Sequence, residues 1–215
     1  MTARIAVLAS GGGTNLQAIL DHVATLGANA PGRVVLVMSD RARAGALERA
    51  RRAGIEAVHL PWPDASATMA PVLATHRVDI VALAGFLRLV PTEVTRAYHE
   101  RIINVHPALL PAFGGPGMYG HHVHEAVLAS GTKVSGATVH FVDEEYDRGE
   151  IIAQSTVPVE PGDTADRLAA RVLAAEHALY PAVLMRICTG FAQGASGKGI
   201  EIRGKDARAP EKDPP

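Results

Sequence analysis

Short, continuous runs of apolar residues alternate along this chain with longer segments in which apolar residues recur every three or four positions. This alternation constrains the fold most, because it is typical of the strand–helix–strand units that build a largely parallel sheet. Runs without a polar interruption fit strands that are covered on both faces. The strands predicted in this way are Ile5–Ala9, Val34–Met38, Glu56–Leu60, Val78–Leu83 and Ile102–Val105.

The segments between these runs have helical spacing. One apolar stripe begins at Leu16 and can end at Gly27, and a basic helix is expected around Ala46–Arg52. The stretch that starts at Pro61 has no clear pattern. We expect a helix to begin near Pro71, since proline suits the first helical turn.

The pattern changes after residue 131. Val134–Val142 and Ile151–Val159 predict two antiparallel strands at an edge of the sheet, and a long helix is expected to start near Thr164. Residues 193–215 have little apolar content, and we interpret them as a disordered tail. The predicted fold class is α/β: a Rossmann-like, mostly parallel twisted sheet with helices on both faces and an antiparallel strand pair near the C-terminal edge. The folded domain would comprise residues 1–192.

The chain has 21 Lys and Arg residues against 22 Asp and Glu residues, which gives a net charge of −1. This balance disfavours a nucleic-acid partner, because nucleic-acid binders concentrate basic residues on one face. The apolar run at the N-terminus is too short for a signal sequence or a membrane span, so we expect a cytoplasmic protein without a membrane partner. Cys188 is the only cysteine, so an intramolecular disulfide is excluded, and we expect a small buried side chain.

A glycine-rich loop, Ser10–Leu16 (SGGGTNL), connects the first predicted strand with the first predicted helix. Glycines let the backbone approach a ligand closely, and the free N–H groups at the start of a helix attract an anion. Thr14 and Asn15 can cap the helix or donate to phosphate oxygens. A tight turn with an ordinary cap is the alternative. A dinucleotide site with Asp40 as its ribose-binding acid is disfavoured, because Leu16 stands where that fingerprint requires its third glycine.

Asn104 and His106 lie two positions apart at the end of a predicted strand, so their side chains share one face. Parallel sheets bind ligands at this edge. An amide and an imidazole suit a carbonyl group that becomes an oxyanion while protons move. Two satisfied polar residues at the start of a loop are the alternative.

Thr138 and His140 repeat this spacing on the next predicted strand. An acid from the loop that follows would stabilise the imidazolium form of His106 and raise its pKa, although a run of acids in a turn is usually just solvated. The acids of this loop are Asp143, Glu144, Glu145 and Asp147.

Five segments together resemble the folate-dependent formyltransferases of purine synthesis, over most of the predicted domain. They are residues 10–16 (SGGGTNL), 84–90 (AGFLRLV), 104–111 (NVHPALLP), 136–142 (GATVHFV) and 147–154 (DRGEIIAQ).

The resemblance implies that the co-substrate 10-formyltetrahydrofolate, a reduced folate, donates its formyl group to the amine of glycinamide ribonucleotide without a metal, in a monomer or homodimer. It also implies that Asn104 and His106 stabilise and protonate a tetrahedral intermediate, while Asp147 supports the charged form of His106. The implied contacts to the ribonucleotide are Gly13, Thr14 and Asn15 at the phosphate and Glu176 at the ribose. The implied contacts to the folate are Leu87, Arg88, Leu89, Val90, Asn104, Asp143, Glu144 and Asp147.

Three features depart from the family pattern. Leu173 stands where the family often has a glutamine, and residues 63–70 lack an arginine that would contact the folate tail. Residues 113–120 are longer than the usual loop, which suggests a mobile lid. His121, His122 and His124 follow this loop without a cysteine or an acid cluster, so we expect a solvated helix start rather than a metal site.

Other functions are alternatives. Formyltetrahydrofolate hydrolase and methionyl-tRNA formyltransferase belong to the same class, but each carries a further domain beyond the one predicted here. A non-catalytic nucleotide-binding module would explain the glycine-rich loop, yet it would leave Asn104, His106 and Asp147 without a role.

Overall fold

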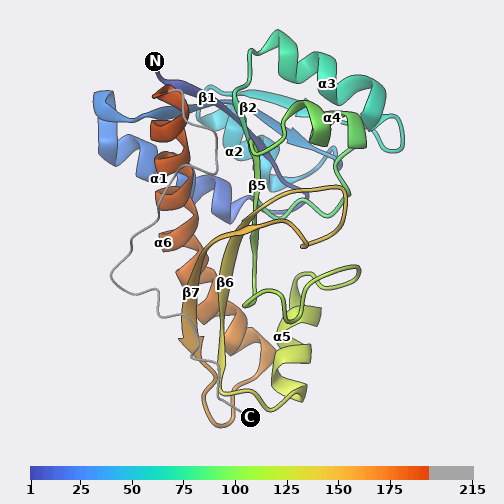
Figure 1. The fold of residues 1–215 in the computed structure, drawn as a ribbon, viewed down its shortest axis with the longest axis vertical. Coiled ribbons are helices and arrows are strands. Elements are labelled where there is room, and N and C mark those ends of the chain that lie inside the picture. Colours follow the sequence, from blue (N-terminus) through green and yellow to red (C-terminus); the bar gives the residue numbers. More distant parts are fainter. Residues whose placement is uncertain (194–215) are drawn as a thin grey trace.

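The structure is a computed structural model that describes residues 1–193. Their strands form one seven-stranded sheet in the order β3-β2-β1-β4-β5-β6-β7 (Figure 1). The first five strands run parallel, whereas β6 and β7 each run antiparallel to their neighbours. The strands are β1 (Ala3–Leu8), β2 (Gly32–Ser39), β3 (Glu56–His59), β4 (Ile80–Leu83), β5 (Ile102–His106), β6 (Val134–Phe141) and β7 (Ile151–Pro158). The α/β fold class predicted from the sequence is confirmed, including its antiparallel edge.

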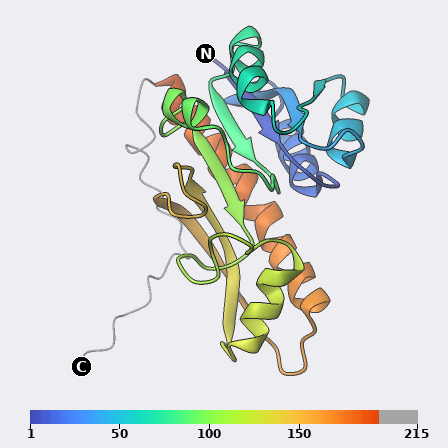
Figure 2. The ribbon, with the colours of Figure 1, turned by 90° about the vertical axis from the view of Figure 1, so that its right-hand side faces the viewer.

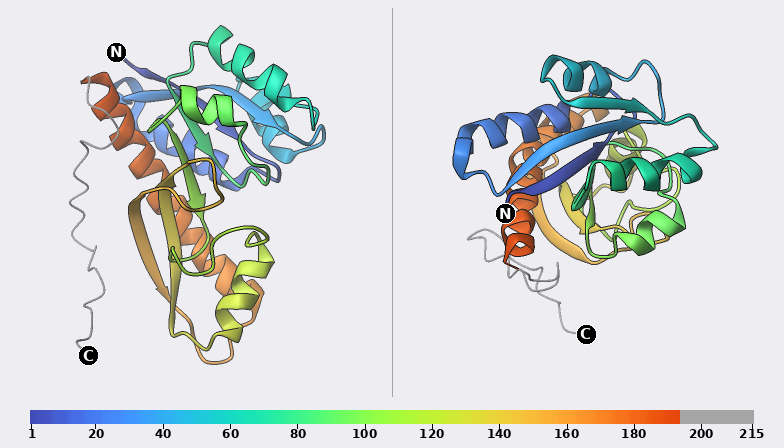
Figure 3. Two further views of the ribbon diagram at one scale, coloured as in Figure 1. Left: turned by 45° about the vertical axis from the view of Figure 1, so that its right-hand side comes forward. Right: turned by 90° about the horizontal axis from the view of Figure 1, so that it is seen from above.

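Helices cover both faces of the parallel part of the sheet, as Figure 3 shows. Their packing follows from β1, whose successive side chains point to opposite faces. Ile5 and Val7 are buried in a core with α1, α2 and α6, and Ala6 and Leu8 in a second core with α3 and α4. The helices are α1 (Thr14–Leu26), α2 (Gly45–Arg52), α3 (Ala65–Thr75), α4 (Thr92–Ala97), α5 (His121–Ala129) and α6 (Ala165–Ala192), with a 3₁₀ turn at Gly27–Asn29.

The long helix α6 runs the length of the molecule and connects its two halves (Figure 2). It packs against α1, α5, β6 and β7. Tyr180 of α6 is completely buried, and the single hydrogen of its hydroxyl is shared between the carbonyl oxygens of Leu83 (2.9 Å) and Ile103 (3.2 Å). This contact ties α6 to the last residue of β4 and to the second residue of β5.

Among the described helices, α6 has the length and hydropathy that could span a membrane, with a mean of 1.2 over its most apolar window. In this structure 44% of that window is buried inside the protein. A core helix of a globular domain passes the same test of length and composition, and the packing of α6 is of this kind.

Several local predictions are confirmed. Gly27 caps the C-terminus of α1, and Thr164 caps α6, where its hydroxyl accepts a hydrogen bond from the backbone N–H of Arg167. Cys188 is buried in α6, and burial raises the pKa of its thiol to about 12.

The predicted start of a helix near Pro71 is wrong. Helix α3 begins at Ala65 and contains Pro71 in its interior. Met69 and Leu73, one helical turn apart, are both fully buried in the core. Their burial stabilises helical structure on the N-terminal side of Pro71. The helix continues through the proline although proline has no N–H group to donate to the preceding turn.

Helix α4 was not predicted from the sequence. Of the predicted tail, residues 194–215 lie outside the described residues, and the domain boundary at residue 192 stays a prediction.

Candidate active site

Strands β4 and β5 end at a cavity of about 580 Å³, a size that suits a small-molecule ligand. Asn104 and His106 of β5 both line it, so the strand spacing brings them together as predicted. Asp147, from the loop between β6 and β7, lines the same cavity. His106 is 3% exposed, so only a small part of its ring is accessible from the cavity.

The carboxylate of Asp147 lies at the centre of this cluster of polar groups. Its Oδ2 lies 3.5 Å from Nδ1 of His106 and accepts a hydrogen bond from the backbone N–H of Gly115 at 3.0 Å. Its Oδ1 lies 3.5 Å from Nε2 of His140 and from Nδ2 of Asn104. Four nitrogen atoms from three segments therefore surround one carboxylate.

Charge and burial have opposite effects on the pKa of Asp147. Burial opposes the ionisation of Asp147, yet its pKa lies below the ordinary value of 3.8. The hydrogen bond with His140, the attraction of His106 and the N–H group of Gly115 outweigh burial. Asp147 is therefore a carboxylate at neutral pH.

Burial lowers the pKa of His106 below its ordinary value of 6.5. Asp147 and the carbonyl oxygen of Phe113 act in the opposite direction but do not overcome burial, and His140 adds a small repulsion. Asp147 therefore raises the pKa of His106 as expected, but burial makes the net shift a lowering. How deeply the ring is buried could not be predicted from the sequence.

His140 is a site residue that the sequence prediction left out. Its Nδ1 lies 2.7 Å from the carbonyl oxygen of Phe141, which can only accept, so Nδ1 carries the proton. In the neutral ring, Nε2 then accepts a hydrogen bond from Nδ2 of Asn104 at 3.1 Å, whereas in the imidazolium form Nε2 is also protonated and can donate to Oδ1 of Asp147, the interaction that lowers the pKa of that carboxyl group. His140 thereby orients the amide of Asn104. The repeated spacing of Thr138 and His140 was the available signal.

The loop that carries Asp147 is shaped by backbone constraints. Asp147 itself has a positive φ of 56°, a conformation that few residues other than glycine adopt. Gly149 passes so close to β6 that a Cβ atom there would lie 1.8 Å from the carbonyl oxygen of Phe141. Glycine at 149 is therefore required for the loop to turn back and aim Asp147 at His106.

The glycine-rich loop stands next to the cavity, and Asn15 is its only member among the described residues that line it. Gly13 caps α1 with a φ of 75°, and no side chain caps this helix, so capping by Thr14 or Asn15 is wrong. Thr14 is exposed beside the free N–H groups of the first turn. A Cβ atom on Gly13 would lie 2.7 Å from Cα of Ala46, so this glycine is also needed for packing against α2.

Helix α2 supports the glycine-rich loop from behind. The backbone N–H of Ala46 donates to the carbonyl oxygen of Gly11 at 3.1 Å. Arg49 donates from Nε to the carbonyl oxygen of Gly12 at 2.8 Å and from a terminal nitrogen to Oε1 of Gln17 at 3.0 Å. Arg49 thus connects the loop to α1 and brings a positive charge to it.

Glu176 of α6 lies deep in the cavity wall and is 6% exposed. Burial raises the pKa of its carboxyl group to about 7, against a hydrogen bond of 2.6 Å from Nδ2 of Asn15 that favours ionisation. Leu173, one turn earlier on α6, lines the cavity as well. The hydrogen bond between the side chains of Asn15 and Glu176 therefore connects the glycine-rich loop with α6.

The segment after β4 also lines the cavity. The predicted folate contacts Leu87, Arg88, Leu89 and Val90 all line the cavity. The backbone N–H of Leu87 donates to Oγ of Ser10 at 3.0 Å, which ties this segment to the first loop. Arg88 pairs with Asp40 at 3.1 Å, so the side chain weighed as a ribose-binding acid is occupied.

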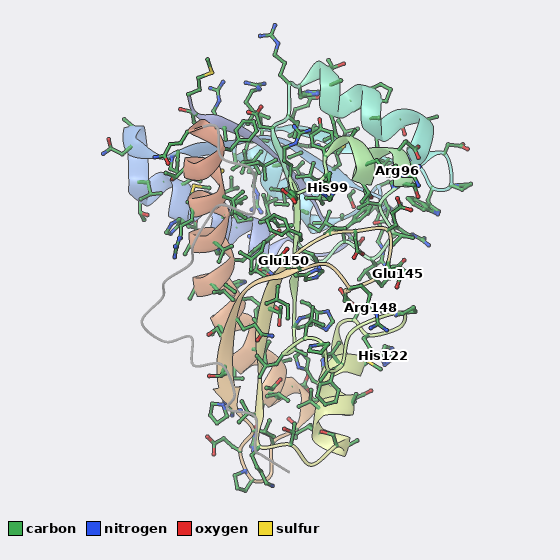
Figure 4. All side chains as sticks on the ribbon, viewed as in Figure 1. Arg96, His99, His122, Glu145, Arg148 and Glu150 are labelled. Carbon is green, nitrogen blue, oxygen red and sulfur yellow. The ribbon has the colours of Figure 1, made fainter. Side chains whose placement is uncertain are left out.

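The acidic loop is only partly where the prediction put it. Asp143 and Glu144 do not line the cavity, whereas Glu145 and Tyr146 do. Asp143 accepts a hydrogen bond from the N–H of Glu145, and Glu144 forms an ion pair with Arg96 at 2.8 Å. Figure 4 shows Glu145 and Arg148 of this loop between Arg96 above and His122 below.

The histidines of α5 have separate environments. His121 is exposed and lies 3.0 Å from Asp166, and His122 lies 3.6 Å from Glu125. His124 is buried, so the prediction of a solvated helix start is wrong for this residue. Within residues 1–193, no group of three or more His, Cys, Asp or Glu side chains is arranged to hold a metal ion.

A sequence model of the formyl transferase family matches residues 3–184. Phosphoribosylglycinamide formyltransferase from Escherichia coli K12 is 40% identical over 86% of this chain and 87% of its own. The chloroplastic enzyme of the same name from Vigna unguiculata is 45% identical over 86% of this chain, which spans 61% of that relative's length.

The crystal structure of glycinamide ribonucleotide transformylase 1 from Symbiobacterium toebii superposes with a TM-score of 0.81 at 46% identity, and the match covers 88% of this chain and 89% of that one. Sequence and structure therefore agree over nearly all of residues 1–193. This chain belongs to the formyl transferase family.

Proposed function

We propose that this chain transfers the formyl group of 10-formyltetrahydrofolate to the amine of glycinamide ribonucleotide, a step of de novo purine synthesis. The observation that carries the proposal is the convergence of Asn104, His106 and Asp147 on the wall of one large cavity. Relatives named for this reaction and matched over most of their length support it.

The reaction begins when the amine attacks the formyl carbon and its carbonyl oxygen becomes an oxyanion. Asn104 supplies an N–H group to this oxygen. One of its two N–H groups is held by His140, and the other makes a contact of 3.5 Å with Asp147, at the limit of hydrogen bonding. That second N–H can turn to the oxyanion, as a donor aimed at developing charge.

Collapse of the intermediate breaks the bond between the formyl carbon and N10 of the folate, and this nitrogen takes up a proton as the attacking amine loses one. His106 in its imidazolium form supplies this proton, its neutral ring then takes up the proton that the amine loses, and Asp147 stabilises the positive ring. In the structure Nε2 of His106 donates to the carbonyl oxygen of Phe113 at 2.8 Å. The folate must replace this contact, which assigns a task to the proposed lid of residues 113–120, because Phe113 is its first residue.

The two substrates would enter from opposite walls. The free N–H groups beside Gly13, Thr14 and Asn15 suit the phosphate of the ribonucleotide, and Glu176 suits a ribose hydroxyl. The backbone of residues 87–90 and the loop at residues 145–147 face the same cavity and suit the pterin. Small-molecule substrates, a cytoplasmic location and a monomeric or homodimeric state complete the proposal.

The test is release of tetrahydrofolate from 10-formyltetrahydrofolate, with and without glycinamide ribonucleotide. We expect release only with the ribonucleotide, together with a product whose mass has increased by one formyl group. Release without an acceptor would instead identify a hydrolase. No release under either condition would refute the proposed function.

A further inference from the structure

His124 is a buried titratable side chain that the mechanism above does not use. It is 5% exposed, and its Nδ1 is completely buried without a hydrogen-bond partner among the described residues. The neighbouring His121 and His122 each face an acidic side chain, whereas His124 faces none. A polar atom buried without a partner costs free energy, so native proteins seldom leave one without a reason.

The packing of α5 fixes where His124 lies. Val123 and Val127 of α5 are fully buried against Leu168 and Val172 of α6. This apolar contact sets the rotation of α5 about its axis, and His124 follows Val123 directly. Its ring therefore forms part of the cavity wall next to α6.

The charge state of His124 suits a hydrogen bond with a neutral group. Burial lowers its pKa, and the positive charges of His121 and His106 act in the same direction. At neutral pH the ring is uncharged, with one N–H donor and one acceptor nitrogen. Such a ring can pair with a hydroxyl or an amide group, each of which can donate and accept.

The position of His124 favours one of the two substrates. His124 lines the same cavity as Leu173 and Glu176 of α6, the helix against which α5 packs and to which the ribose is assigned. The pterin is assigned to the wall formed by residues 87–90. The acceptor carries ribose hydroxyls and a glycyl amide, which are the groups that a neutral imidazole can recognise.

We propose that His124 is a binding residue for the acceptor ribonucleotide, which supplies the hydrogen-bond partner that the protein does not. This inference rests on the proposed function, since it takes glycinamide ribonucleotide as the acceptor.

The test is His124→Phe, which keeps a ring of similar width and removes both nitrogens. Calorimetric titration with glycinamide ribonucleotide should show an affinity about tenfold weaker than in the wild type, the size of one lost hydrogen bond. The KM for 10-formyltetrahydrofolate should change less than about twofold. The melting temperature should not fall, because no protein partner is lost. His124→Asn, which keeps a polar atom near the position of Nδ1, should recover part of the affinity.

His122→Phe is the matched control, since His122 is a histidine of the same helix that does not line the cavity. It should bind the ribonucleotide as the wild type does. Should the phenylalanine not fit at position 124, His124→Leu gives the same comparison. Unchanged ribonucleotide affinity, or equal weakening for both substrates with a lowered melting temperature, would overturn the inference. A wild-type protein that binds the ribonucleotide but forms no formylated product would instead count against the proposed function.

Discussion

The carboxylate of Asp147 and the ring of His106 lie 3.5 Å apart, from Oδ2 to Nδ1, and both side chains are largely buried. Burial favours the neutral form of each group, whereas their mutual attraction favours the charged forms. The carboxylate is ionised through additional donors, while the imidazole has a lowered pKa. The proton of His106 is therefore weakly held, which suits a general acid.

Replacement of Asp147 by asparagine tests this relationship. The attraction that raises the pKa of His106 disappears, so the pKa should fall further and less imidazolium should remain at neutral pH. We expect kcat to fall by roughly 10²–10⁴ and the pH profile of kcat to move to lower pH. A profile that keeps its shape and position would remove Asp147 from this role.

His106→Ala should lower kcat by roughly 10²–10⁴, since general acid–base catalysis contributes this much. Ribonucleotide binding should remain mostly intact, because the groups assigned to phosphate and ribose lie elsewhere. Steady-state kinetics together with a binding titration separates the two effects. Near-normal turnover would show that His106 is not part of the mechanism.

Arg49→Met tests the support behind the glycine-rich loop. Loss of the hydrogen bond to the carbonyl oxygen of Gly12 should raise the KM for the ribonucleotide about five- to tenfold with little change in kcat. The effect should vanish with an acceptor that lacks the phosphate. Arg51→Met is the control, since Arg51 is exposed and its ion pair with Glu48 is long, at 3.9 Å. An equal effect on the acceptor without phosphate would contradict the role given to Arg49.

The buried carboxyl group of Glu176 should make stability depend on pH. Its pKa is about 7 in the folded chain and 4.5 as the ordinary value. Between these values the folded state holds a proton that the unfolded state has lost. The contribution of Glu176 is therefore full below pH 4.5 and declines as the pH rises through 7.

Glu176→Gln removes this titration and keeps an oxygen that can accept the hydrogen bond from Asn15. Relative to the variant, the wild type should lose about 2 kcal/mol of unfolding free energy between pH 5.5 and pH 8. Denaturant unfolding of both proteins at the two pH values measures the difference. A constant difference across this range would mean that Glu176 does not titrate as described.

Much of the fold could be predicted because the parallel strands are short apolar runs, and the edge pair of β6 and β7 has its own alternation. The start of α3 could not be predicted, since Pro71 signals the first turn of a helix. The burial of Met69 and Leu73 instead favours a helix that begins earlier, at Ala65. Helical propensity is a local property, and this burial depends on the rest of the chain.

The candidate site divides in the same way. Asn104 and His106 follow from the period of a strand, and the glycine-rich loop from its place between strand and helix. Which side chains of one short loop line the cavity depends on the turn at Gly149, so the sequence could not show that Glu145 and Tyr146 line it while Asp143 and Glu144 do not. The burial of His124 and the lowered pKa of His106 depend on neighbours that lie far away in the sequence.

The hydroxyl contact of Tyr180 with two strands sets the register of α6 against the sheet. Tyr180 is held by the carbonyl oxygens of Leu83 and Ile103, and Ile103 directly precedes Asn104. Glu176 lies one turn before Tyr180 on the same helix. A slip of α6 by one residue would move Glu176 about 1.5 Å along the helix axis while Asn104 stayed in place. The buried phenol thus holds constant the distance between the carboxyl group of Glu176, which we propose binds the ribose, and Asn104 at the proposed reacting centre, and it would thereby set the length of acceptor that can span them.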